Sequence, residues 1–98
     1  MITAEEVVRG LLDSALSINQ RIDMALVAGE FEDSSVRAAL ETIVGSQEKE
    51  LVPYACTALV SFWLREGTPD RELFHSLSYE GKYLVKQALL HEAPEWLV

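Results

Sequence analysis

Apolar residues recur at alternating spacings of four and three residues through the first part of the chain, and this spacing constrains the fold most. The series is Ala4, Val8, Leu11, Ala15, Ile18, Ile22 and Ala25. Such spacing places the apolar side chains on one face of an α-helix. Thr3 and Glu6 form a capping-box pattern at the start, and Gly29 is a natural helix end. The sequence therefore predicts one long amphipathic helix at about residues 4–28.

Turn residues delimit a second, shorter helix. Apolar side chains at helical spacing run from Val36 to Val44, and Gly45 follows them. Asp33 or Ser34 can cap this helix, because a short polar side chain accepts hydrogen bonds from the first free amides. We predict a helix that is capped at one of these two residues and ends at Gly45.

An uncharged stretch of 14 residues, from Leu51 to Leu64, lies in the middle of the chain. A membrane span needs about 20 apolar residues, so we expect a central helix that is buried on most of its sides. Pro53 suits its first turn, where the missing amide costs little. Alternatively, the helix begins at Ser46 and is kinked at Pro53. Gly67 ends it in either case.

Two further helix starts follow. Thr68-Pro69-Asp70 has the residues of a helix start and leads into a short segment. Ser78 can begin the last main helix, which runs to about Glu92. Pro94 either breaks that helix or opens a final short turn.

No stretch shows the two-residue alternation of a strand, and the chain has no Asn-Gly or Asp-Gly hairpin turn. We therefore predict an all-α fold, a compact single-domain bundle over residues 1–98 with four main helices plus short helical turns. Short connectors make consecutive helices antiparallel, so an up-and-down bundle is the default. At this length roughly 65% of the unfolded chain's surface can be buried, which is enough for one core.

One segment has the features of a repeat unit. It runs from Val36-Arg37-Ala38-Ala39-Leu40 to Trp63, with Val52-Pro53 opening a helix, and it resembles one helical hairpin of the HEAT-repeat type. The resemblance covers under a third of the chain. A solenoid needs about three units of roughly 40 residues each, so we do not extend the resemblance to the whole chain and predict no internal repeat.

The charge balance limits the classes of partner. Sixteen acidic residues against eight lysines and arginines give a net charge of −8. Nucleic acids and anionic membranes are bound through Lys and Arg, so we expect neither as a partner. The lone Cys56 excludes an intramolecular disulfide, and the chain starts with acidic residues where a secretory signal would be basic. These features predict a cytoplasmic protein.

No motif for catalysis or for ligand binding is present in the sequence. His75 and His91 are sixteen residues apart and lack the spacing of a zinc site. Cys56 has no Lys, Arg or His within one helical turn to lower its pKa, so a buried, inert thiol is expected. There is no GxSxG elbow, P-loop or GxGxxG loop. We predict no metal, no cofactor and no enzymatic activity.

An acidic turn between the first two predicted helices is the first candidate binding surface. Glu30, Phe31, Glu32 and Asp33 place an aromatic side chain among three carboxylates. In one interpretation Phe31 folds inward and seals the end of the bundle. In the other, Phe31 anchors a partner and the three acids steer a basic surface towards it.

The apolar C-terminus is the second candidate surface. The tail Trp96-Leu97-Val98 either docks on the chain's own bundle or forms an adhesive patch for a second subunit or another protein. The apolar stripe of the first predicted helix could also form an intermolecular seam. Its width and alanine content favour an intramolecular core instead.

These features together predict a small acidic helical protein that binds a basic surface of another protein, as an inhibitor, immunity or regulatory protein. The candidate partner-binding residues are Glu30, Phe31, Glu32, Asp33 and Trp96. A self-assembling structural or scaffold protein, as a homodimer or a larger oligomer, is the alternative. A small enzyme or ligand carrier is the third possibility.

Overall fold

The computed structural model describes residues 1–97, and helices account for all of its regular structure. The elements are α1 (Ala4–Leu12), α2 (Ile18–Ala28), α3 (Ser34–Val44), α4 (Val52–Glu66), α5 (Arg71–Ser76), α6 (Tyr79–Glu92) and the 3₁₀ helix η1 (Pro94–Leu97). The described residues contain no strand, so the predicted all-α class is confirmed. No helix within residues 1–97 is long and apolar enough to cross a membrane.

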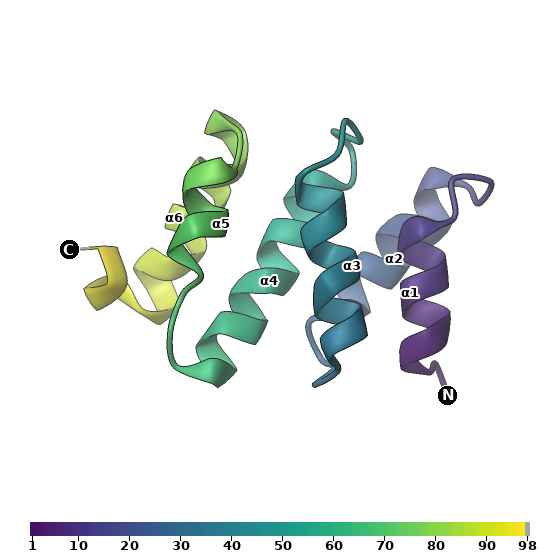
Figure 1. Ribbon diagram of the computed structural model, residues 1–98, viewed down its shortest axis with the longest axis horizontal. Coiled ribbons are helices and arrows are strands. Elements are labelled where there is room, and N and C mark those ends of the chain that lie inside the picture. The colour runs from purple at the N-terminus through teal and green to yellow at the C-terminus, as the bar shows by residue number, and fades with distance from the viewer. Residues whose placement is uncertain (98) are drawn as a thin grey trace.

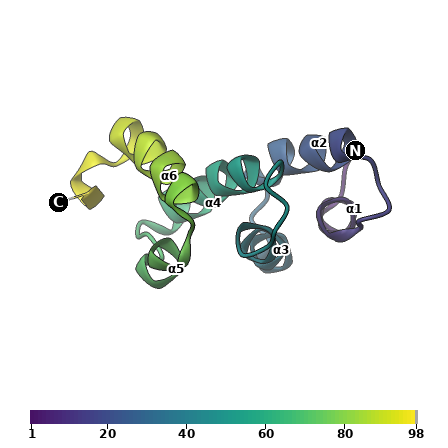
Figure 2. The same cartoon turned by 90° about the horizontal axis from the view of Figure 1, so that it is seen from above.

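The helices stack as three antiparallel hairpins, α1–α2, α3–α4 and α5–α6 (Figure 1). Seen from above, α1, α3 and α5 form one row, and α2, α4 and α6 form a second row (Figure 2). Within the rows α1 packs against α3, and α4 packs between α2 and α6. We call the row of α2, α4 and α6 the second layer.

In this two-layer stack the packing runs from α1 and α2 through α3 and α4 to α6, whereas α5 has no buried residue. The first helices of the three hairpins begin 30 and 37 residues apart. The stack measures 40 × 26 × 20 Å, and its radius of gyration of 12.7 Å is that of a compact chain of this length. The predicted compact all-α fold of antiparallel helices is thus confirmed, and its hairpins lie side by side in two layers.

The predicted single helix at residues 4–28 is also wrong, because α1 ends at Leu12 and α2 begins at Ile18. Ser17 and Gln20 form a complete capping box at the start of α2. The side-chain oxygens of Gln20 and Ser17 accept hydrogen bonds from the backbone amides of Ser17 and Gln20. In a continuous helix these amides would instead donate to backbone carbonyls of the preceding turn. The local caps therefore outweigh the unbroken apolar spacing.

A close approach of α1 and α2 follows from this break. A Cβ atom placed on Gly10 would lie 2.2 Å from Cγ of Met24, so the absence of a side chain lets the two helices pack. Asp13 supports the turn, because its Oδ1 accepts a hydrogen bond from the amide of Ala15 at 2.9 Å.

The other helix boundaries follow the signals in the sequence. Asp33, Asp70 and Ser78 cap α3, α5 and α6 with their side-chain oxygens. Pro53 lies in the first turn of α4, so the alternative of a kinked helix from Ser46 does not occur. Gly67 ends α4 in the left-handed conformation, with φ of 82°.

The core is centred on α4, which matches the prediction of a central buried helix (Figure 1). Its buried residues are Ala55, Cys56, Ala58, Leu59, Val60, Phe62 and Trp63. This helix contacts α2, α3 and α6. It therefore joins the three hairpins into one core.

Arg21 is the only charged residue that is buried within residues 1–97. Its guanidinium donates to the Leu11 carbonyl at 2.7 Å and to both carboxylate oxygens of Glu48, at 2.5 and 2.9 Å. These bonds tie the first turn of α2 to α1 and to the loop between α3 and α4. Such paired, hydrogen-bonded geometry is what a buried charge requires.

Candidate functional site

The acidic turn lies between α2 and α3, and its aromatic residue contributes to packing. Phe31 is half-buried and packs against the core. Arg65 of α4 donates hydrogen bonds to the carbonyls of Gly29 and Phe31, at 2.6 Å each. The guanidinium of Arg65 also lies 4.8 Å from the ring centroid of Phe62. The turn is thus fastened to the end of α4.

The three carboxylates of the turn have different surroundings. Asp33 caps α3, and hydrogen bonds from the Ser35 hydroxyl and from the amides of Ser35 and Val36 lower its pKa. Glu32 is 81% exposed and lies 4.0 Å from Nε of Arg65. Glu30 is exposed and lines a groove of about 200 Å³ between α2 and α4. Glu30 and Glu32 are therefore the two acids with exposed carboxylates.

The C-terminal candidate residue docks on the chain itself. Trp96 is half-buried and packs against the core, and its amide donates to the Ala93 carbonyl at 3.0 Å. Leu97 is 37% exposed, and Val98 lies outside the described residues. Trp96 and the acidic turn line different cavities, so the structure does not unite all five predicted residues in one site.

Exposed large apolar side chains gather on the second layer. Within its helices these side chains are Leu26, Tyr54, Tyr79, Tyr83 and Leu90. Among the described residues of α1, α3 and α5, Leu12 alone is comparably exposed. Scattered exposed apolar residues are ordinary, whereas contiguous exposed apolar patches are typical of interaction surfaces. We call these five residues the second-layer surface.

Two grooves run along this surface. Leu26, Tyr54 and Glu30 line the groove between α2 and α4. Tyr79 and Tyr83 line a wider hollow of about 670 Å³, together with Val52 at the start of α4 and residues of the loop between α3 and α4. Four of the five side chains therefore border hollows that a partner's side chains can enter.

Sequence reasoning missed the second-layer surface. Tyr79, Tyr83 and Leu90 follow a helical spacing along α6, and this spacing alone does not show whether another helix covers them. Leu26 lies within the single helix predicted at about residues 4–28. The capping box at Ser17 is a sequence signal that could have indicated the exposure of Leu26. The box starts a new helix at Ile18, and this break changes which face of α2 is covered by other helices.

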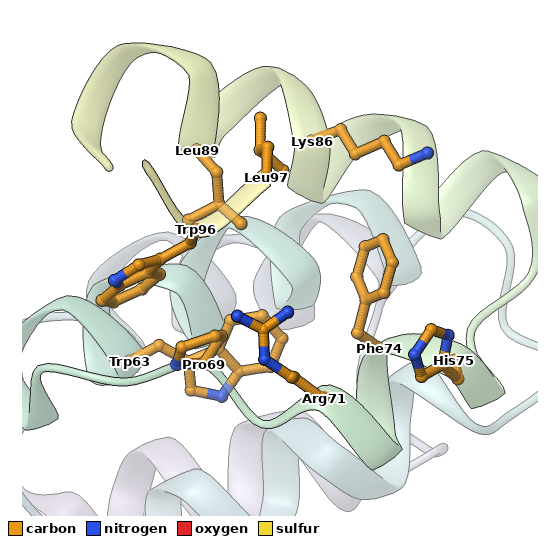
Figure 3. A pocket seen from close by; sticks show the side chains of 9 residues that line it. All are labelled: Trp63, Pro69, Arg71, Phe74, His75, Lys86, Leu89, Trp96 and Leu97. Atoms are coloured by element: carbon orange, nitrogen blue, oxygen red, sulfur yellow. The ribbon is translucent and has the colours of Figure 1, made fainter. Parts of the chain in front are cut away.

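A separate small cavity lies at the C-terminal end of the stack, between α4, α5, α6 and η1 (Figure 3). Its volume is about 140 Å³, and its aromatic walls are Trp63, Phe74 and Trp96. Trp63 is fully buried, and its indole N–H has no acceptor among the described residues. A buried donor without a partner is uncommon in folded proteins.

Cys56 is buried, as predicted, and burial raises the pKa of its thiol to about 11. A thiol with such a pKa stays protonated at neutral pH and is a poor nucleophile. No three His, Cys, Asp or Glu side chains within residues 1–97 are grouped as metal ligands would be.

The raised pKa of Cys56 predicts a pH dependence of stability. In the unfolded chain the thiol ionises near 9.0, whereas in the native protein it keeps its proton up to about 11. The unfolded state therefore loses its proton first, and the free energy of unfolding falls as the pH rises from 9 to 11. We expect a loss of at most about 2–3 kcal/mol.

Urea denaturation of the native chain and of Cys56→Ala over that pH range measures the loss of unfolding free energy that is due to Cys56. Both proteins share every other titrating group. The native chain should lose stability more steeply than the variant. Equal slopes would contradict the assignment.

Comparisons of the chain with protein-family models, with curated proteins and with solved structures found no match. Its function is therefore inferred from its own residues and geometry.

Proposed function

We propose that this chain acts by binding another protein, and that the second-layer surface makes the contact. The supporting observation is that five exposed large apolar side chains lie on α2, α4 and α6, whereas among the described residues α1, α3 and α5 have Leu12 alone. Stacked helical hairpins present extended surfaces of this kind, which repeat proteins use for binding. Tyrosine and leucine side chains beside grooves supply apolar contact area, and tyrosine is frequent among residues that dominate binding energy.

The charge distribution favours a basic partner. Residues 1–50 hold ten acidic and four basic residues, and residues 51–98 hold six and four, which gives net charges of −6 and −2. The more acidic half contains α2 and the acidic turn. Within that half, Glu30 lines the same groove as Leu26. Acids beside an apolar contact speed the approach of a basic surface and suppress acidic competitors.

The mechanism that fits these features is masking of a basic surface. Charge attraction brings the partner to the stack, and Leu26 and Tyr54 then hold it at the groove between α2 and α4. The bound chain occludes the surface that the partner uses elsewhere. This is the mechanism of an inhibitor, immunity or regulatory protein, and it requires no chemistry by the chain itself.

The steering role of the acids predicts a change in association rate. The partner is first captured from a native extract by the intact chain, and its binding is then followed kinetically at several salt concentrations. Glu30→Lys combined with Glu32→Lys should lower the association rate about tenfold or more and flatten its salt dependence.

A matched control is Glu5→Lys combined with Glu6→Lys, which changes the charge equally on exposed positions of α1. The control should keep most of the native association rate. If the two double variants bind alike, the acidic turn does not steer the partner. Recovery of only the chain itself would favour self-assembly.

A further inference from the structure

The C-terminal cavity combines aromatic walls with side chains of basic residue types. Arg71, His75 and Lys86 line it, and no acidic residue does. This concentration of basic groups is notable in a chain with a net charge of −8. The local charge therefore favours an anion, in contrast to the rest of the molecule.

Arg71 is the basic residue placed to bind such an anion. Figure 3 shows its guanidinium among the lining side chains, between Phe74 on one side and Leu89 and Trp96 on the other, and Arg71 is an exposed residue. The ammonium of Lys86 points away from this space (Figure 3). The salt bridges within residues 1–97 use Arg21, Arg37 and Arg65, and Arg71 takes part in none of them. A guanidinium offers paired donors that match a carboxylate.

The size of the cavity limits the rest of the ligand. A volume of about 140 Å³ is close to that of apolar protein cavities that hold a single benzene ring. Phe74 and Trp96 are partly exposed beside this volume and can pack against a ring face or edge, and the fully buried Trp63 lies behind them. A larger or fully polar ligand would not match both the volume and the walls.

The geometry points to a binding site for a small aromatic carboxylate with one ring. The ring lies between Phe74 and Trp96, in front of the buried Trp63, and the carboxylate accepts hydrogen bonds from Arg71. This site is independent of the second-layer surface and of the partner proposed above. Its ligand would join α5, which has no buried residue of its own, to α4 and η1.

Intrinsic fluorescence is a direct probe of this site, because the chain has two tryptophans and both line the cavity. The purified chain is titrated with benzoate, with its neutral isostere benzamide and with acetate, under excitation selective for tryptophan. Benzoate should produce a saturable change, whereas benzamide and acetate should each bind about tenfold more weakly or not at all. The same titration of the urea-unfolded chain corrects for direct quenching by the ring.

Arg71→Gln tests the carboxylate contact, and Arg9→Gln is the matched control, because it removes the same charge from an exposed position on α1. The first variant should weaken benzoate binding about tenfold or more, and the second should bind as the native chain does. Thermal unfolding with and without benzoate supplies a second readout, since a ligand of the native state raises Tm. Absence of saturable benzoate binding, equal binding of benzamide, or unchanged affinity in Arg71→Gln would each overturn the assignment.

Discussion

Replacing Trp63 by alanine should lower the free energy of unfolding by about 3–5 kcal/mol. Trp63 is the largest fully buried side chain of the core, and it lies on the helix that joins the three hairpins. Its removal leaves a void next to a cavity that already exists between α4, α5, α6 and η1. A domain of this size has a total stability of about 5–15 kcal/mol, so the variant loses a large part of it. Urea denaturation followed by far-ultraviolet circular dichroism measures the change.

Trp63→Phe separates the ring from its N–H group. The phenylalanine keeps an aromatic ring in the core and removes the indole donor that has no acceptor within residues 1–97. Loss of an unsatisfied donor offsets part of the smaller ring's loss in packing. We therefore expect a cost of about 1.5 kcal/mol or less. A Trp63→Ala variant within about 1 kcal/mol of the native chain would contradict the central position of Trp63 in the core.

Helix content and most helix ends could be predicted because their causes are local. Asp33, Asp70 and Ser78 are caps that act on the next three amides, and Gly67 ends α4 through its own backbone. The break between α1 and α2 was missed because apolar residues continue through it at helical spacing. There the capping box at Ser17 decides the structure.

The layered arrangement could not be predicted from such local signals. Which helices pack together depends on contacts between residues far apart in the chain, such as the bonds from Arg21 to Glu48. Short connectors are equally compatible with a closed bundle and with stacked hairpins. Gly10 permits close packing of α1 on α2, but its sequence context does not show which helix approaches it.

The candidate site residues were also only partly predictable from the sequence. The sequence identified a turn rich in acids and an apolar tail, and the structure places Glu30 beside a groove and Trp96 beside a cavity. The sequence could not show that Arg65 fastens the turn or that Arg71 lines the cavity. Arg65 and Arg71 lie far from the acidic turn and from Trp96 in the chain. The second-layer surface depends on the helix packing and was equally out of reach.

The second prediction with a large expected effect concerns the affinity of the chain for its partner. Replacing Leu26 and Tyr54 by serine should weaken the affinity for the captured partner by about a hundredfold or more. Central apolar anchors of an interface contribute about 2 kcal/mol or more each when truncated, and about 1.4 kcal/mol changes an affinity tenfold. Both side chains are exposed, by 61% and 38%, so their replacement should leave the fold and its circular dichroism spectrum intact. Most of the loss should be in the dissociation rate.

Parallel capture from a native extract tests the proposed surface most directly. The baits are the native chain, Leu26→Ser combined with Tyr54→Ser, and Leu12→Ser, whose side chain is exposed to a similar degree on α1. A basic protein retained by the native chain and by Leu12→Ser, and lost from the double variant, is the predicted result. Equal retention of that protein by all three baits would contradict binding through the second-layer surface.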